Sequence, residues 1–337
     1  MDRKDEIILQ QMDLIRSMTE RNLRSMDTDF WGTPLMEKKT NQPPVSGKSE
    51  KPASQSQAEK PEEKEEIPPK EKIEDLLAEL DSYIGLQTVK EEVHNLINMA
   101  SVYQLRRQHG LPTTDMSLHL VFTGNPGTGK TMMARMMARI YRSLDILSRG
   151  QLVEADRSGL VAGYVGQTAL KTQKVIEKAM GGVLFIDEAY ALNGKSENDF
   201  GQEAIDTVLK AMEDHRDELV VILAGYTKEM EVFLTANSGL ASRFPNKIEF
   251  PDYTADELLD ITAVLAKGKG YRLAESCTFP LLGYYKRRQA LDSRTAGNGR
   301  LARNTLEKAI FNQSRRLIAE PAAPLDLIQP SDLEFEE

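Results

Sequence analysis

The segment GNPGTGKT at residues 124–131 constrains the fold more than any other part of the chain. It has the spacing G-x-x-x-x-G-K-[ST] and lies directly between an apolar run, LHLVF, and a helical pattern, MMARMMARIYR. Glycines let backbone N–H groups turn inward, and the N-terminus of the following helix adds partial positive charge, so a strand–loop–helix unit of this kind suits phosphate. The segment predicts a phosphate-binding loop, called the P-loop below; the alternative is a glycine-rich turn before a helix.

Two side chains of the P-loop carry its expected chemistry. We expect Lys130 to reach the β- and γ-phosphates of ATP and the Thr131 hydroxyl to bind Mg²⁺. Lys130 is therefore also a candidate catalytic residue. The residues of this Walker A segment expected to contact the nucleotide are Gly124, Asn125, Pro126, Gly127, Thr128, Gly129, Lys130 and Thr131.

A second apolar run ends in two adjacent carboxylates, in the sequence GGVLFIDEAY. Acidic side chains at the end of a buried strand are costly unless cationic or metal partners lie close by. Asp187 is therefore expected to hold Mg²⁺, which is the Walker B role, and Glu188 to orient and polarise the water that attacks ATP. The alternative is a strand end whose acids are solvated. With the P-loop upstream, the pair favours hydrolysis of the bound nucleotide.

The order of patterns along the chain predicts the fold class. Short apolar runs alternate with amphipathic patterns over residues 73–251, which indicates a parallel α/β sheet with crossover helices. Helical patterns alone continue over 252–337, and they begin with a capping box of Thr254 and Glu257. The chain is thus predicted to be a P-loop NTPase of the α/β class with a C-terminal helical lid. The expected strands lie in LHLVFTG, GQLVEAD, GVLFIDEA and ELVVILAGY.

Two segments of different character precede this core. Residues 1–40 begin with a short amphipathic helix in which Ile8, Met12 and Ile15 recur at helical spacing. Residues 41–72 are rich in Pro, Glu, Lys, Ser and Gln. A stretch of this composition buries too little apolar surface to offset its ordering entropy, so it is expected to be a disordered linker.

Composition argues against several classes of function. The net charge of −9 argues against a dedicated nucleic-acid binder, because phosphate backbones are held by excess Lys and Arg. One cysteine, Cys277, and four histidines without zinc-ligand spacing argue against disulfides and structural zinc. The N-terminus does not resemble a signal peptide, and the longest strongly apolar stretch, 219–224, is too short to span a bilayer. A cytoplasmic protein without a membrane partner is expected.

Three residues further along are additional candidates, each with a plain alternative. Arg243, in SGLASRFPNKIEF, is placed to project as an arginine finger onto a neighbouring subunit's γ-phosphate; the alternative is a surface ion pair. Arg300 lies in the first turn of the last helix, where a cation costs about 0.3 to 1 kcal/mol, which favours a contact with ATP. Tyr164, in GLVAGYVGQTALKT, lies on a glycine-flanked loop that suits gripping of an extended polypeptide; the alternative is a packed loop tyrosine.

In this order the motifs resemble those of the AAA+ ATPases, and specifically the branch that contains the rubisco activase CbbX and stage V sporulation protein K. The resemblance covers residues 73–317. It is carried by GNPGTGKT, GYVGQTALKT, GGVLFIDEAYAL, DFGQEAIDTVLKAMED, VVILAGY, SRFP with FPDY, and the final GR-xx-RN segment.

The resemblance implies an ATPase that converts ATP and water to ADP and phosphate within a homo-hexameric ring, with ATP at the subunit interfaces. It further implies that Arg243 acts in trans, that Arg300 is the sensor-2 residue, and that Tyr164 faces a central pore and remodels a client protein. Ile84 and Gly85 look like the segment of this family that packs on the adenine.

Three positions depart from the family pattern. Tyr226 falls where many members have a polar Asn or Thr as sensor 1. Asn237 is followed by Ser-Gly-Leu where the branch usually has Pro-Gly-Leu, and residues 159–162 read Gly-Leu-Val-Ala where it tends to have Asp-Leu-Val-Gly. The last two changes remove no chemical group from the ATP site, so we expect them to affect the pore or the subunit interface.

Two other functions stay open at this point. A nucleotide-gated scaffold would assemble with a partner through its N-terminal tail without threading, and deletion of residues 1–72 would separate docking by the tail from pore function. A small-molecule kinase would share only the P-loop, and Glu188, Arg243 and Arg300 argue against it. The residues do not identify the client, since rubisco activation and sporulation are both roles within the family.

Overall fold

The described part of the structure begins at Lys70. The helix expected within 1–40 and nearly all of the linker expected at 41–72 lie outside it. All described residues belong to the second of the two units into which the chain divides, Met1–Ile67 and Pro68–Glu337. The computed structural model describes residues 70–112, 117–164, 166–194, 199–291 and 297–335.

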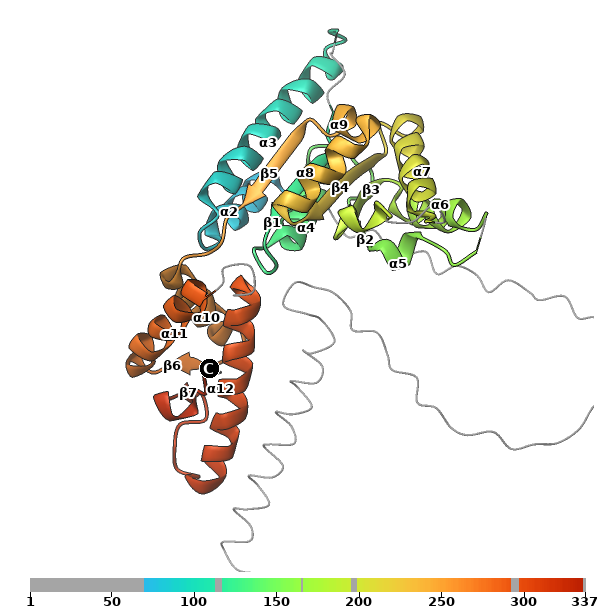
Figure 1. The fold of residues 1–337 in the computed structure, drawn as a ribbon. Coiled ribbons are helices and arrows are strands. Elements are labelled where there is room, and N and C mark those ends of the chain that lie inside the picture. Colours follow the sequence, from blue (N-terminus) through green and yellow to red (C-terminus); the bar gives the residue numbers. More distant parts are fainter. Residues whose placement is uncertain (1–69, 113–116, 165, 195–198, 292–296, 336–337) are drawn as a thin grey trace, which may run out of the picture. The chain divides into compact units, whose positions relative to one another are not determined.

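A five-stranded parallel sheet forms the centre of the fold (Figure 1). Its strand order is β2-β3-β4-β1-β5, and every neighbouring pair is parallel. Parallel strands need crossover connections, which helices supply along this chain. The predicted α/β class is confirmed. The strands are β1 (Leu120–Gly124), β2 (Leu152–Ala155), β3 (Gly182–Ile186), β4 (Leu219–Gly225) and β5 (Asn246–Phe250).

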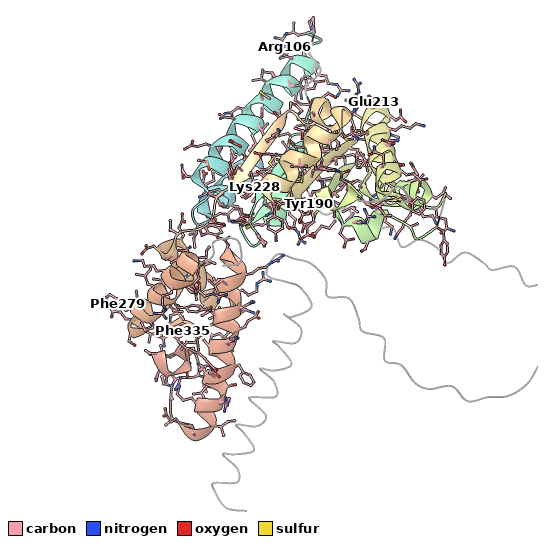
Figure 2. The ribbon with its side chains drawn as sticks, in the orientation of Figure 1. Arg106, Tyr190, Glu213, Lys228, Phe279 and Phe335 are labelled. Atoms are coloured by element: carbon pink, nitrogen blue, oxygen red, sulfur yellow. The ribbon has the colours of Figure 1, made fainter. Side chains whose placement is uncertain are left out.

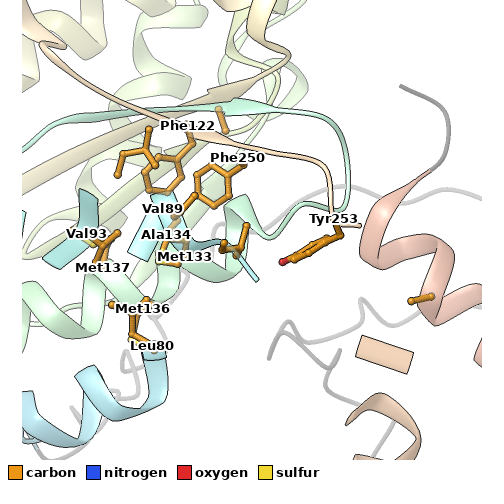
Figure 3. Close-up of a cluster of buried hydrophobic side chains, with 14 of the residues drawn as sticks. Leu80, Val89, Val93, Phe122, Met133, Ala134, Met136, Met137, Phe250 and Tyr253 are labelled. Atoms are coloured by element: carbon orange, nitrogen blue, oxygen red, sulfur yellow. The ribbon is translucent and has the colours of Figure 1, made fainter. Parts of the chain in front are cut away.

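The central strands are buried on both faces, which explains their continuous apolar runs. Their side chains alternate between two cores. Leu120 and Phe122 belong to the core that contains residues of α2, α3 and α4, whereas Val121 belongs to the core with α6, α7 and α8. In the first core the rings of Phe122 and Phe250 lie 5.0 Å apart and tilted by 55° (Figure 3).

The remaining elements of the α/β part are helical. They are α2 (Ile73–Ser82), α3 (Gln87–Gln108), α4 (Lys130–Ser143), α5 (Arg157–Leu160), α6 (Thr168–Ala179), η1 (Ala189–Leu192), α7 (Gly201–Asp214), α8 (Thr227–Ala236) and α9 (Ser238–Arg243).

The described residues that follow β5 are mainly helical, as predicted for the lid. The capping box at the start of α10 is confirmed, since Thr254 Oγ1 accepts from Glu257 N at 3.2 Å and Glu257 Oε2 accepts from Thr254 N at 2.7 Å. The expectation that strands end before the lid is wrong at one place, where β6 and β7 form a short parallel pair. The elements are α10 (Ala255–Gly268), β6 (Arg272–Leu273), η2 (Glu275–Cys277), α11 (Thr278–Leu291), α12 (Asn298–Ala319), β7 (Leu327–Ile328) and η3 (Pro330–Asp332).

Within the described ranges, none of the helices combines the length and the apolar character needed to cross a bilayer.

A buried histidine supports the start of β1. His119 is only 9% exposed, and its Nδ1 accepts a hydrogen bond from the backbone N–H of Val221 on β4 at 3.0 Å. Burial lowers the pKa of His119 to about 4. In the unfolded chain a histidine titrates near about 6.5. Between these two pKa values the histidine is therefore protonated in the unfolded state and neutral in the folded state.

We predict that this histidine makes the protein sensitive to acid. Because its pKa is lower in the folded state, the free energy of unfolding should fall by about 2 kcal/mol between pH 7 and pH 5 through this group. The variant His119→Asn keeps an acceptor near the Nδ1 position but cannot titrate, so it should lose this part of the pH dependence in urea unfolding. The exposed His109→Asn is the control, and an equal pH dependence in both variants would contradict the prediction.

Candidate functional site

The P-loop connects the carboxyl end of β1 to the first turn of α4. Its glycines take left-handed backbone conformations, with φ of 78° at Gly127 and 97° at Gly129. Such angles disfavour residues with a Cβ atom. Thr128, which is buried, donates its hydroxyl to Asn125 O at 2.8 Å and so closes the loop internally. The loop therefore wraps around the N-terminus of α4, where backbone N–H groups are available for an anion.

Lys130 lies inside this loop. Its Nζ donates to Gly124 O and Asn125 O, both at 2.8 Å. Burial lowers the pKa of Lys130 to about 8, and the negative charge of Asp187 acts in the opposite direction. Arg300 also lowers the pKa of this amine, whereas Asp252 and Glu188 raise it.

These electrostatic effects show that the structure brings residues from four parts of the chain around one amino group. The P-loop, the end of β3, the segment after β5 and the start of α12 contribute to this group. A site with this set of charges can bind a polyphosphate and a divalent cation together.

The two acids after β3 have distinct environments. Asp187 donates its backbone N–H to Ala155 O at 2.9 Å, and its carboxylate accepts from the backbone N–H of Glu188 at 3.0 Å. Glu188 is exposed and has a φ of 47°, a conformation that costs a non-glycine residue about 1 kcal/mol or more. The chain leaves the strand direction here, and the exposed Glu188 side chain can reach a water molecule.

The oxygen ligands present fit Mg²⁺. The Thr131 hydroxyl and the Asp187 carboxylate are hard oxygen donors of the kind that this cation prefers. Among the described residues, no three His, Cys, Asp or Glu side chains gather as a metal site of their own. Mg²⁺ is usually bound by one or two protein oxygens together with substrate phosphates and water.

The segment expected to pack on the adenine lies next to the end of the P-loop. A Cβ atom built on Gly85 would meet the Glu257 carboxylate and, at 3.3 Å, the ring of Tyr253. A Cβ built on Gly129 would lie 3.5 Å from the Tyr253 hydroxyl and 3.6 Å from Leu86. The structure thus brings the 84–86 segment, the P-loop and Tyr253 together. Ile84, the first residue of this segment, is half-buried.

Arg300 lies against the P-loop from the lid side. It is in the first turn of α12, and its Cγ is 3.3 Å from the position that a Cβ on Gly127 would take. The backbone N–H of the preceding Gly299 donates to Gly127 O at 3.0 Å. The stem of this exposed arginine therefore rests on the loop, and its charge acts on Lys130.

Two polar residues that the sequence analysis did not single out, Asp252 and Asn298, connect the P-loop to the lid. Asp252 accepts two hydrogen bonds from Asn125 Nδ2, at 2.9 and 3.0 Å, and one from Asn298 Nδ2, at 2.8 Å. Asn298 in turn accepts from the backbone N–H of Tyr253 at 3.0 Å. The one local signal for Asn298 is its place between two glycines, in GNGR, directly before a helix.

Tyr226, which the family resemblance places at the position of sensor 1, lies next to Tyr190. It follows β4, and its ring lies 5.9 Å from the ring of Tyr190. Burial raises the pKa of Tyr190 to about 12, and the negative charge of Glu188 contributes to the same shift. Tyr190 therefore stands near Glu188 with Tyr226 beside it, and Tyr226 falls where many family members have a polar Asn or Thr.

Arg243 does not reach this group within its own chain. It ends α9 and forms an ion pair with Glu213 on α7, and its Nη1 donates to Gly239 O at 3.1 Å. Arg243 comes just before β5, at the amino end of the sheet, whereas Lys130 and Glu188 follow the carboxyl ends of their strands. Figure 2 shows Glu213 and Tyr190 at these opposite ends. A five-residue strand separates the two ends by about 16 Å.

Tyr164 is exposed, with 73% of its surface accessible, on the loop between α5 and α6. Side chains of α6 fix the base of this loop. Thr168 Oγ1 accepts from Ala162 N at 3.1 Å, and Lys171 Nζ donates to Val161 O at 3.0 Å. The aromatic side chain is thus presented from a supported loop and is not packed into the core.

Comparison with known proteins identifies the family. The profile of the "ATPase family associated with various cellular activities (AAA)" matches residues 120–252, and that of the AAA lid domain matches residues 254–337. Stage V sporulation protein K of Bacillus subtilis is 41% identical over 73% of this chain and 77% of its own length. The chain belongs to the AAA ATPase family. As an AAA ATPase it binds and hydrolyses ATP, which confirms the predicted enzyme class.

Other relatives of this AAA ATPase give the same result. The chloroplastic ribulose bisphosphate carboxylase/oxygenase activase of Cyanidioschyzon merolae is 43% identical over 75% of this chain and 87% of its own length. Protein CbbX of Cereibacter sphaeroides is 42% identical over 76% and 82%. A solved structure of a Thermotoga maritima RuvB mutant has a TM-score of 0.50 at 22% identity, covers 75% of this chain and 69% of its own, and shows the fold alone. The predicted resemblance to the CbbX and stage V sporulation protein K branch is confirmed.

We predict that Gly127→Ala lowers the ATPase rate by at least about tenfold. The substitution would strain the backbone of the P-loop and push the loop away from Gly297. The added methyl group would fall inside the van der Waals distance of Gly297 O, at a φ of 78°. Gly268→Ala is the matched control, since a Cβ there meets nothing within 4 Å. Steady-state phosphate release measures the effect, and a Gly127→Ala rate within twofold of the parent would show that this contact is unimportant.

Proposed function

We propose that this AAA ATPase works as a hexameric ring that hydrolyses ATP at the interfaces between copies and remodels a client protein gripped by Tyr164. The observation that carries the proposal is the position of Arg243 at the opposite end of the sheet from Lys130 and Glu188. An arginine side chain does not span a strand length, so Arg243 cannot reach the nucleotide of its own chain, and in this proposal it acts on the nucleotide of another copy.

Within one chain the proposed division of work follows the geometry. Lys130 and the P-loop backbone hold the phosphates, while the 84–86 segment packs on the adenine. Thr131 and Asp187 hold Mg²⁺, which neutralises phosphate charge when bound. Glu188, turned out of β3 by its left-handed backbone, orients the attacking water and accepts its proton. Arg300 contacts the phosphates from the lid.

Between chains, Arg243 completes the site. A guanidinium aimed at the γ-phosphate stabilises the charge that develops in the transition state. The surface that carries Arg243 and the surface that carries the nucleotide site then lie at different ends of the sheet, so the contact between copies is head-to-tail. Such contacts close into rings when the rotation between copies permits. In this proposal the ion pair between Arg243 and Glu213 is exchanged for the partner's phosphate on assembly.

The client contact is assigned to the loop that carries Tyr164. An aromatic ring offers a large contact area with few rotatable bonds, so it grips an extended polypeptide without sequence specificity. One relative is named as an activase of ribulose bisphosphate carboxylase/oxygenase, which agrees with remodelling of another protein. The α/β core at 73–251 and the lid at 252–337 form the motor of a cytoplasmic protein, and residues 1–72 are left for a partner.

A mixing experiment tests the shared site. Arg243→Ala and Glu188→Gln should each abolish most of the ATPase rate when assayed alone. In an equal mixture a complete site forms wherever an Arg243→Ala subunit faces an intact arginine from its neighbour, so about a quarter of the parent rate should return. Arg272→Ala, which removes an exposed arginine with its own carboxylate partner, should keep the parent rate. A mixture no faster than its components would exclude catalysis between subunits.

A second experiment tests the aromatic grip. The probe is reduced, carboxymethylated α-lactalbumin, a permanently unfolded polypeptide, which should stimulate the parent ATPase. Tyr164→Ala should lose this stimulation and keep a basal rate within about twofold, because the loop lies outside the ATP site, while Tyr164→Phe should behave as the parent. Leu170→Ala removes an exposed apolar side chain of α6 as the control. Stimulation that survives Tyr164→Ala would favour a nucleotide-gated scaffold.

A further inference from the structure

The contact between the P-loop and the lid is made by backbone and amide groups and does not depend on an arginine alone. Asn298 Nδ2 lies 3.4 Å from Pro126 O, and Gly299 N donates to Gly127 O at 3.0 Å. Two successive carbonyls of the P-loop therefore face donors from the first turn of α12. A Cβ on Gly299 would lie 2.9 Å from Gly127 O, so the approach is close.

The side chain of Asn298 is buried and fully hydrogen-bonded. The backbone φ is 46°, in the left-handed region that Asn adopts more readily than most residues other than glycine. The residue is only 2% exposed, and both ends of its amide are used. Its Oδ1 accepts from Tyr253 N and its Nδ2 donates to Asp252.

Asp252 makes the connection continuous. Its carboxylate lies between Nδ2 of Asn298 in the lid and Nδ2 of Asn125 in the P-loop. It is also two residues past the end of β5, so it belongs to the chain segment that leads from the sheet into α10. Sheet, P-loop and lid are thus joined through one carboxylate and two amides.

We propose that Asn298 is a positioning residue that fastens α12 to the P-loop carbonyls, so that the lid follows the conformation of the loop itself. The inference rests on the proposed role of the P-loop in holding the phosphates. Arg300, in the same first turn of α12, would respond to the phosphate that it contacts. Asn298 responds to the order of the loop, which any nucleotide with α- and β-phosphates provides.

Affinities for ATP and ADP separate these two roles. They are measured by displacement of a fluorescent nucleotide from the full chain carrying Glu188→Gln, which prevents hydrolysis. Asn298→Asp keeps the acceptor for Tyr253 N but loses the donor and sets a carboxylate against Asp252. This variant should lower the affinities for ATP and for ADP by about tenfold each, and the ratio of the two affinities should stay within twofold of the parent value. Arg300→Ala should weaken ATP more than ADP. Asn304→Asp, an exposed change on the same helix, is the control.

A double variant that exchanges the residues at 298 and 252 distinguishes loss of this contact from loss of folding. In the double variant Asn298→Asp with Asp252→Asn, residue 252 offers an oxygen to Asn125 and an N–H to residue 298, so these two contacts can form again with the charge moved, whereas the donor to Pro126 O stays lost. Both affinities should recover by at least about threefold over the single variant. Asn298→Gly relaxes the backbone and removes the amide. Its affinities for both nucleotides should lie between those of the parent and those of Asn298→Asp.

The outcomes decide between the inference and the proposed function. Parent-like affinities in Asn298→Asp, or a loss confined to ATP, would overturn the role given to Asn298. A double variant that binds neither nucleotide more tightly than Asn298→Asp would also overturn it. Lys130→Ala tests the site itself: if this variant keeps its affinity for nucleotide, the proposed phosphate contacts are wrong whatever Asn298 does.

Discussion

The common direction of the five strands decides where this molecule can do chemistry. In a parallel sheet every strand ends at the same edge, so the P-loop after β1, the acids after β3, Tyr226 after β4 and Asp252 after β5 are brought to one edge from distant parts of the chain. The same rule sends the segment before β5, with Arg243, to the other edge. The arrangement that assembles the candidate site thus separates it from its candidate arginine.

The parts of the site that could be predicted from the sequence are those with local signals. The P-loop has fixed glycine, lysine and threonine spacing between a strand and a helix, and Asp187 and Glu188 end a fully apolar run, so neither needs knowledge of the fold. Tyr164 is flanked by glycines, and the structure does leave its side chain exposed. The strands β1, β3 and β4 could be predicted for the same reason, because burial on both faces leaves an uninterrupted apolar pattern.

The parts that could not be predicted depend on contacts between distant segments. Asn298 and Pro126 are 172 positions apart, and nothing near either residue announces that they meet. Asp252 looks like an ordinary acid after a proline until its two amide partners are seen. The strands β6 and β7 have two residues each, too few for a periodic pattern. The pairing of Arg243 with Glu213 likewise follows from the packing of α9 near α7.

A single arginine links the acids after β3 to both the aromatic loop and the helix that carries Glu213. Arg157 opens α5, and its guanidinium donates to Ala191 O in η1 and to Asp199, each at 2.7 Å. Asp199 also accepts from Gly201 N at the start of α7, at 2.8 Å. A guanidinium is rigid and planar, so η1 and the start of α7 cannot shift relative to each other without straining one of these bonds.

The chain runs from α5 directly into the loop of Tyr164, while η1 comes immediately after Glu188. Arg157 thus makes the one contact across space, with Ala191, in a connection from Glu188 to the base of the Tyr164 loop that otherwise follows the covalent chain and does not pass through the sheet.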